Sequence, residues 1–261
     1  MPLAQMLIVY IPPQFLLGII VLLFIALSFL GLIITRKIIS HERLLIHNDV
    51  VGPIFSTVGV IYAVILAFVV IVTWQNFDRV NLGVEKEASC LASLYSDSDA
   101  FEQHQQLKIR GLLRDYAKAI VKDEWPKMSF GSSSRMAADK MHEIRNFYSS
   151  MLPNGRTQDI YLQESVSKLN ELLDYRNVRL LNAKEGVHPI LWFTLISGAV
   201  ITMLISFLFG TKNFDTQKVM TILLAAIIAF ILFTVLELDY PFSGANSIKP
   251  DAFIRLIEFN R

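Results

Sequence analysis

Four long runs of apolar residues, separated by stretches that hold nearly all the charges, dominate the pattern of the chain. Charged side chains are absent from four ranges, residues 1–35, 50–77, 189–211 and 219–236. A helix needs about 20 largely apolar residues to cross the hydrocarbon core of a bilayer, because each residue rises about 1.5 Å. The pattern therefore predicts four transmembrane helices. Their expected bounds are residues 13–35, 53–77, 189–210 and 219–236.

The second apolar run has a recognisable beginning and no clear end. Gly52-Pro53 suits a helix start, where the missing N–H of proline costs nothing, so we expect this helix to begin near Pro53. After residue 77 the apolar spacing continues at Val80, Val84, Ala88 and Leu91, and only Gly83 weakens the helix. The second span is therefore expected to continue as a helix into water, to about residue 95.

Residues 78–187 read as a helical extramembrane domain, because apolar residues recur there at helical spacing. Beyond the continuation of the second span, three helices are expected, one at about 105–124, one that includes residues 141–151, and one at about 158–183. The stretch Gly131-Ser132-Ser133-Ser134 is interpreted as a loop with an N-cap signal for the second of these, and Trp125-Pro126 is expected to end the first. Asp123 and Glu124 are interpreted as part of a solvated helix face.

These elements predict an all-α membrane protein in which a helical soluble domain is inserted between the second and third of four transmembrane helices. Two of the soluble helices would be membrane helices extended into water, namely the one that leaves span two, at 78–95, and the one that leads into span three, at 158–183. Residues 237–261 are expected to form a C-terminal tail.

Composition narrows the function classes. The net charge is +1, and residues 75–187 hold sixteen basic and sixteen acidic side chains, so nucleic acid is not an expected partner. The single cysteine, Cys90, excludes an internal disulfide and a multi-cysteine metal site. Neither a glycine-rich phosphate loop nor an H-E-x-x-H motif occurs in the sequence, so we expect no cofactor and no enzymatic activity.

The charges beside the spans bear on orientation. The two short connections, 36–49 and 211–218, hold five basic residues, which favours a cytoplasmic position for them and an extracytoplasmic central domain in the inner membrane. Arg176, Arg179 and Lys184 precede the third span and favour the opposite orientation.

The second span is rich in small and hydroxyl-bearing residues, and two interpretations are open. Gly59, Ala63 and Ala67 lie four apart, with Ser56 beside Gly59, and small residues at that spacing allow close helix packing in lipid. Alternatively Ser56, Gly59, Ala63 and Ala67 line a pore, in which Tyr62 and apolar neighbours form a constriction that closes by dewetting. Two further acidic residues would then lie at the pore mouths, Asp49 and Asp78.

Several stretches resemble a bacterial family of membrane proteins of unknown function that is labelled bestrophin-like. The matching residues are Asn48-Asp49-Val50-Val51-Gly52, Val58 to Phe68, Glu87-Ala88-Ser89 with Leu94-Tyr95, Glu124 to Met128, Asp174 to Arg179, Leu191-Trp192 and Pro241-Phe242-Ser243-Gly244. The match extends over nearly the whole chain.

The resemblance implies a distant likeness to bestrophins, which are oligomeric anion channels with a pore-lining second helix and a large cytoplasmic domain. No acidic calcium clasp of the bestrophin type is evident in the C-terminal residues. The leading hypothesis is a homo-oligomeric ion channel whose partners are the lipid bilayer and small inorganic ions. The alternative is a non-conducting membrane scaffold or sensor whose central helices bind a partner.

Overall fold

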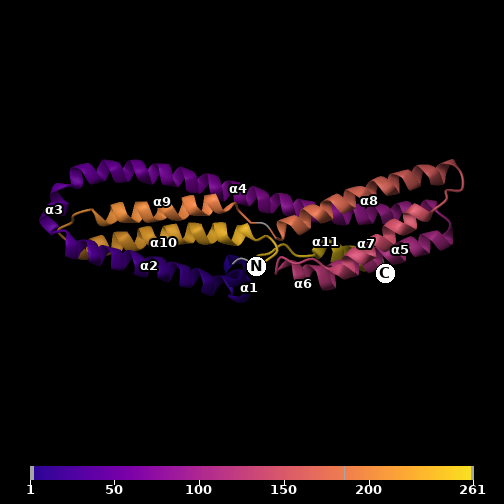
Figure 1. Cartoon of the computed structure of the whole chain (residues 1–261), viewed down its shortest axis with the longest axis horizontal. Coiled ribbons are helices and arrows are strands. Elements are labelled where there is room, and N and C mark those ends of the chain that lie inside the picture. Colours follow the sequence, from indigo (N-terminus) through magenta and orange to yellow (C-terminus); the bar gives the residue numbers. More distant parts are fainter. Residues whose placement is uncertain (1–2, 185, 260–261) are drawn as a thin grey trace. The chain divides into compact units, whose positions relative to one another are not determined.

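The computed structural model describes residues 3–184 and 186–259, and most of these lie in helices (Figure 1). No strand occurs within these two ranges, so the predicted all-α class is confirmed. The helices are α1 (Leu3–Tyr10), α2 (Pro13–Ile38), α3 (His41–Ile46), α4 (Asn48–Asp97), η1 (Ser98–Ala100), α5 (Gln103–Ala119), η2 (Ile120–Glu124), α6 (Trp125–Met128), α7 (Arg135–Ser150), α8 (Arg156–Asn182), α9 (Pro189–Phe207), α10 (Phe214–Asp239) and α11 (Asp251–Phe259).

The chain divides into two compact units. The apolar unit contains residues 10–75 and 187–239, and the polar unit contains the described residues of the ranges 1–9, 76–186 and 240–261. Helix α4 contributes residues 48–75 to the first and residues 76–97 to the second. The expected continuation of the second span as one helix is therefore confirmed.

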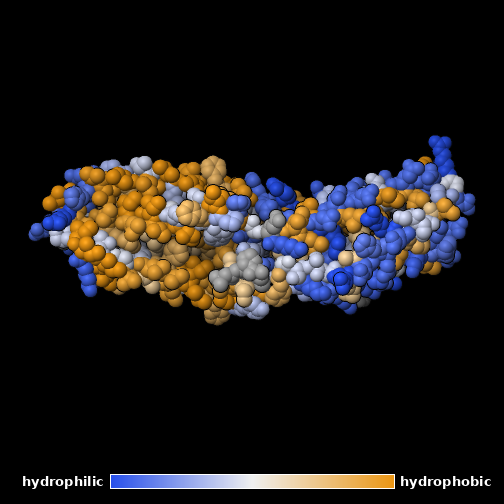
Figure 2. Space-filling view, in the orientation of Figure 1, coloured by the Kyte–Doolittle hydropathy of each residue, from blue (hydrophilic) through white to orange (hydrophobic). Residues whose placement is uncertain are grey.

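The apolar unit is built from α2, α9, α10 and the first part of α4. Each of these four helices is long and apolar enough to cross a membrane. The prediction of four long apolar helices is therefore confirmed. Figure 2 shows their largely hydrophobic surface. Two glycines allow close contacts within the unit, because a Cβ on Gly31 would lie 2.4 Å from the Phe207 ring and one on Gly198 would lie 2.4 Å from the Tyr62 ring.

The starts of two apolar helices differ from those expected. Helix α4 begins at Asn48, so the predicted start near Pro53 is wrong. Pro53 lies in the second turn, where its missing N–H leaves only the Asp49 carbonyl without an intrahelical partner. Helix α10 begins at Phe214, before the charge-free run itself, because Asn213 Oδ1 accepts hydrogen bonds from the backbone N–H groups of residues 215 and 216.

The polar unit packs α5, α7 and α8 against residues 76–97 of α4. The N-cap of α7 is Ser134, the last residue of the predicted N-cap stretch, and its Oγ accepts a hydrogen bond from the Ala137 N–H at 3.0 Å. The expected helix end at Trp125-Pro126 is wrong, because the chain passes through the π-helix η2 into α6.

The terminal segments are not simple tails. Helices α1 and α11 both belong largely to the polar unit, and neither is anticipated by the apolar spacing. Helix α11 buries Phe253 in the core, and the Trp125 Nε1–H donates to the Ile248 carbonyl at 3.1 Å. The residues expected as a C-terminal tail therefore complete the hydrophobic core of this unit.

Candidate functional site

The four predicted pore-lining residues lie on one flank of α4 in the apolar unit. Ser56, Ala63 and Ala67 are exposed, and Gly59 is partly buried. Gly59, Ala63 and Ala67 line a hollow of about 580 Å³ whose other wall is formed mainly by α10. The small side chains are therefore accessible and do not form a close helix contact within this chain. A Cβ on Gly59 would meet nothing within 4 Å.

The adjacent flank of α4, which shares the wall of this hollow through Tyr62 and Leu66, packs within the apolar unit. Tyr62, Leu66 and Val69 are buried there with residues of α9 and α10. The Tyr62 hydroxyl donates to the Leu195 carbonyl at 3.0 Å, and its ring lies against Gly198. The interpretation that Tyr62 forms part of a pore constriction is therefore wrong for this conformation, because its ring is used to hold α4 against α9.

The two predicted mouth residues are both exposed on α4. Asp49 lies in the first turn, within the apolar unit, and Asp78 lies 29 residues later, within the polar unit. At about 1.5 Å per residue, they are separated by roughly 43 Å along the helix axis. That length exceeds the hydrocarbon thickness of about 30 Å, so each carboxylate has water within reach if this segment spans a bilayer.

Polar contacts in the apolar unit are concentrated at helix ends. Asn48 forms a reciprocal pair with Gly210: its Nδ2 donates to the Gly210 carbonyl at 2.8 Å, and its Oδ1 accepts from the Gly210 N–H at 2.9 Å. Asp239 accepts hydrogen bonds from the Val187 N–H and from the Trp192 Nε1–H. These contacts tie the first turn of α4 and the end of α10 to the flanks of α9.

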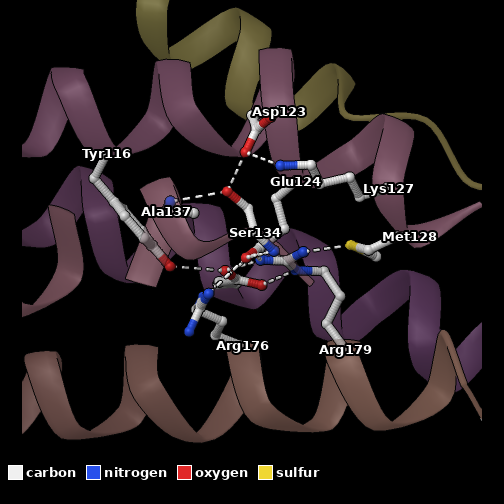
Figure 3. A network of polar contacts seen from close by, with 10 residues as sticks. Tyr116, Asp123, Glu124, Lys127, Met128, Ser134, Ala137, Arg176 and Arg179 are labelled. Atoms are coloured by element: carbon white, nitrogen blue, oxygen red, sulfur yellow. Dashed lines mark hydrogen bonds and ion pairs between the residues drawn. The ribbon is translucent and has the colours of Figure 1, made fainter. Parts of the chain in front are cut away.

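The polar unit contains a buried network of four charged side chains (Figure 3). Glu87 of α4 and Glu124 of η2 are 0% exposed, and Arg179 of α8 is 2% exposed. Arg179 binds Glu87 with Nε and Nη2 at 2.6 and 2.9 Å, and its Nη2 also lies 2.8 Å from Glu124. Arg176 pairs with the second oxygen of Glu124. Two positive and two negative charges therefore balance.

Neutral groups complete this network. The Tyr116 hydroxyl donates to Glu87 at 3.4 Å, and the Ser134 N–H donates to Glu124 at 3.4 Å. The Arg179 guanidinium also lies 5.3 Å from the Trp125 ring centre, where the ring face attracts a cation. The Arg179 Nη1 lies 2.7 Å from the Met128 sulfur.

The environment raises the pKa values of two of these groups, for different reasons. Burial alone would lower the pKa of the Arg179 guanidinium, but attraction to Glu87 and Glu124 outweighs it and raises that pKa. Burial and the Glu87 carboxylate raise the pKa of Tyr116 well above its usual value. Arg179 therefore stays charged and Tyr116 stays a hydrogen-bond donor at neutral pH.

The π-helix explains how Glu124 reaches the arginines. The Trp125 N–H donates to the Ile120 carbonyl, five residues back, so this turn holds an additional residue. Pro126 has no N–H, and its ring would clash with the Lys122 carbonyl in a regular α-helix. The wider turn removes that conflict and changes the direction of the following side chains. The interpretation of Glu124 as solvated is therefore wrong, whereas Asp123 is partly exposed and pairs with Lys127.

The sequence does contain a signal for the network. Glu87 lies three residues after Val84 and four before Leu91, both buried, so it occupies a core position of α4. Arg176 and Arg179 likewise follow Leu169 and Leu172 at helical spacing along α8; these are core positions too. Charged residues on an otherwise apolar helix face indicate a buried ion pair, but they do not identify the partners.

A Bestrophin-like domain profile matches residues 22–253, which is most of the chain. The chain belongs to the Bestrophin-like family. The stretches that carry this family's resemblance include Glu87, Glu124, Arg176, Arg179 and the segment around Phe242. The first four form the charge network, and the Phe242 ring packs edge-on against Trp125 beside it. Much of the family pattern outside the apolar helices therefore converges on one place in the polar unit.

Solved structures with the same fold include a bacterial bestrophin homologue. The bestrophin-like chain resembles a point variant of a bacterial bestrophin homologue from Klebsiella pneumoniae with a TM-score of 0.70 at 17% identity, covering 94% of this chain and 98% of that one. A second variant gives 0.67 at 18% identity, covering 93% and 96%. A third structure, described as a membrane protein, gives 0.62 at 19% identity over 93% and 96%. Among curated proteins, none matches the sequence.

Proposed function

We propose that the bestrophin-like protein is a homo-oligomeric ion channel in which residues 53–77 of α4 line the pore. The observation that carries the proposal is the division of α4 into two faces. One face packs within the apolar unit through Tyr62, Leu66 and Val69, and the other is open along the whole apolar segment. Bestrophins are ion channels, and the resemblance assigns their pore to the second helix, which corresponds to α4.

The open face of α4 has a composition that suits a narrow water path. Ser56, Ala63 and Ala67 offer small or hydroxyl-bearing side chains, and residues 50–77 contain no charged side chain. A helix that faced only lipid would gain from larger apolar residues at these positions. Several copies of α4 around an axis would bring these small residues close to one another, with Asp49 and Asp78 towards the two ends.

Three larger apolar residues on the open face could form a constriction. Val60, Val64 and Phe68 follow one another at four-residue spacing and are 64%, 49% and 65% exposed. At about 100° per residue, Val60 and Val64 point roughly 160° away from the packed Tyr62. Hydrophobic rings in a pore interrupt the water column and thereby stop ions. In this proposal Val60, Val64 and Phe68 take the place that the sequence interpretation gave to Tyr62.

The test is ion flux through purified protein in liposomes, compared between two phenylalanine variants. Phe68→Ala should raise the flux of small monovalent ions, because it widens and hydrates the proposed constriction. Phe29→Ala on α2 is the matched control, since Phe29 is an exposed aromatic residue of the apolar unit away from α4. Absence of flux above empty liposomes for common cations and anions, with protein of normal melting temperature, would contradict the proposal.

A scaffold or sensor is the second candidate, and one observation favours it. The polar unit has a hollow of about 630 Å³ between α4, α5 and α11, lined by both charged and small residues. Arg110 and Arg255 stand on its walls, paired with Asp99 and Glu85. A partner that bound there would act without any ion flux, so a silent flux assay would move this candidate to first place.

Localisation and orientation follow as proposals. We expect the inner membrane, with the short connections 36–49 and 211–218 cytoplasmic and the polar unit extracytoplasmic. Arg176 and Arg179, which favoured the opposite orientation by sequence, form ion pairs with buried carboxylates inside the core of the polar unit. They therefore carry little weight as charges beside the membrane. A cysteine at Ser133 in a Cys90→Ser background should react with a membrane-impermeant maleimide before lysis. Labelling only after lysis would invert the orientation.

A further inference from the structure

A second groove in the apolar unit adjoins the hollow beside Ala63, with which it shares Phe55, Leu224 and Ile227. It has a volume of about 430 Å³ and runs along α10, between the start of α4 and the end of α9. Its lining residues are Phe55, Ser206, Phe209, Thr211, Gln217, Met220, Thr221, Leu223, Leu224 and Ile227. The four proposed pore-lining residues are not among them.

The length of this groove is apolar, and its polar groups already have partners. Met220, Leu223 and Ile227 are 64%, 58% and 58% exposed along one wall. On the buried side, the Gln217 amide donates to the Phe209 carbonyl at 2.7 Å, and the Ser206 hydroxyl donates to the Met203 carbonyl at 2.7 Å. A polar ligand would find few hydrogen bonds here, whereas a hydrocarbon chain would replace exposed apolar surface.

The length of the groove suits an extended chain. From Gln217 to Ile227 the groove follows ten residues of α10, which is about 15 Å. A hydrocarbon chain that lay parallel to α10 over this length would cover the exposed side chains of Met220, Leu223 and Ile227.

One end of the groove lies beside basic residues, and Arg36 donates there to the Thr211 carbonyl at 3.2 Å and to Gln217 Oε1 at 3.0 Å. Thr211 and Gln217 line this end, and Lys212 and Lys218 are their immediate neighbours in sequence. Lys212 is exposed, and the Lys218 Nζ lies 4.4 Å from the Phe214 ring centre and 2.8 Å from Asp215. The two short connections together hold five basic and three acidic residues. Figure 2 shows hydrophilic residues at the α3 end of these helices, next to the hydrophobic surface.

We propose that this groove binds one acyl chain of an anionic phospholipid, with the lipid phosphate held by Lys212 and Lys218. Basic side chains at the end of a membrane helix attract anionic head groups, and an apolar groove that begins beside them fixes the chain that follows. Binding of this kind needs no ion conduction, so it can be tested separately from the channel proposal.

The test counts lipids bound to purified protein by native mass spectrometry. Phosphatidylglycerol and phosphatidylcholine with identical acyl chains are the two probes. We expect phosphatidylglycerol to bind roughly tenfold more tightly, because the lysines contribute only to the anionic head group. The variant with both Lys212→Gln and Lys218→Gln should lose that preference. Lys122→Gln, an exposed lysine of the polar unit, should keep it.

A second pair of variants tests the acyl chain. Leu223→Trp should fill the groove and weaken binding of both lipids, whereas Leu27→Trp on α2, at a similarly exposed position, should not. Millimolar inorganic phosphate should fail to displace phosphatidylglycerol. The proposal is overturned if the two lipids bind equally, if Leu223→Trp binds like the unchanged protein, or if phosphate displaces the lipid. It is also overturned if Leu223→Trp alters the mass of the assembly and leaves lipid binding unchanged. Melting curves in detergent verify that each variant is folded.

Discussion

In the polar unit, two glutamates and two arginines lie in the core, whereas in the apolar unit charged side chains lie only near helix ends. The polar unit can bury Glu87 and Glu124 because each carboxylate oxygen meets an arginine or a neutral donor. Inside the apolar unit, the hydroxyls of Thr73 and Thr202 instead donate hydrogen bonds to carbonyls of their own helices, at 2.7 and 2.8 Å.

This difference shows two ways of giving helices a unique position. A charge network accepts only one set of partners, since any other arrangement leaves a buried charge unpaired. Apolar side chains discriminate less, so the apolar unit depends on shape: Gly198 accepts the Tyr62 ring, and Gly31 accepts the Phe207 ring. The first mechanism depends on electrostatics and the second on packing, and variants can separate them.

The largest effect is expected from Glu124→Ala. This change leaves the buried Arg176 without a carboxylate and removes one of the two carboxylates that Arg179 binds, and breaking a buried pair typically costs about 3–5 kcal/mol. Unfolding in detergent should therefore begin at a much lower temperature or denaturant concentration. Glu143→Ala, which breaks only the exposed pair with Lys140, should stay within about 0.5 kcal/mol of the unchanged protein. A loss below about 1 kcal/mol for Glu124→Ala would mean that the network contributes little.

A smaller loss is expected when the shape contact of the apolar unit is changed. In Gly198→Ala the new methyl group would lie 2.4 Å from the Tyr62 ring, which is held by its hydrogen bond to Leu195. Overpacking of this kind costs about 1–3 kcal/mol. Gly18→Ala is the matched control, because a Cβ there meets nothing within 4 Å. Equal melting temperatures for the two variants would show that α4 and α9 adjust freely.

Asn48→Ala tests the polar contacts at helix ends. It removes both hydrogen bonds to Gly210, at 2.8 and 2.9 Å, in a place that is partly buried. We expect a loss of about 1–2 kcal/mol, measured by thermal unfolding. Asn81→Ala, at an exposed position of α4, should be nearly neutral. If the two variants unfold alike, the first turn of α4 is held by packing alone.

The smallest effect at neutral pH is expected from Tyr148→Phe, and it grows in alkali. Burial raises the pKa of the Tyr148 hydroxyl, and the nearby Ser165 hydroxyl offsets only part of that shift. Because the folded pKa lies above the unfolded value of about 10, the stabilisation is complete below pH 10 and is lost as pH rises further. The variant should therefore lose less stability between pH 9 and pH 11. Burial also raises the pKa of Tyr116, so this residue still causes part of the loss of stability in alkali, both in the variant and in the unchanged protein.

The sequence predicted the apolar helices because length and absence of charge are local properties. It also predicted that α4 continues past residue 77, since the spacing from Val80 to Leu91 is that of one helix face. The start of α4 was predicted wrongly because a proline at the second turn costs one hydrogen bond, which the surrounding contacts offset. The Asn48–Gly210 pair that holds this turn joins residues 162 apart, and local patterns contain no trace of it.

The candidate site was predicted only in part. The small residues of α4 were recognisable, and their accessibility required the structure. Whether they line a pore stays a prediction. Glu124 was misinterpreted because a regular helix through Ile120 would turn its side chain elsewhere, and a π-turn has no reliable sequence signature. The inserted arrangement of the helical domain, and its bounds at 78–187, likewise stay predictions.

The separation of Glu87 from Arg179 has a consequence during synthesis. Ribosomes add about 5–20 residues each second, so the 92 residues between them take roughly 5–18 seconds to emerge. Until then Glu87 has no arginine to neutralise it, and the polar unit gains nothing by enclosing it. The unpaired carboxylate therefore favours a hydrated, unpacked core until α8 has been synthesised. A chain interrupted before Arg179 should accordingly be cut rapidly by proteases within residues 76–150, and one that includes Arg179 should resist.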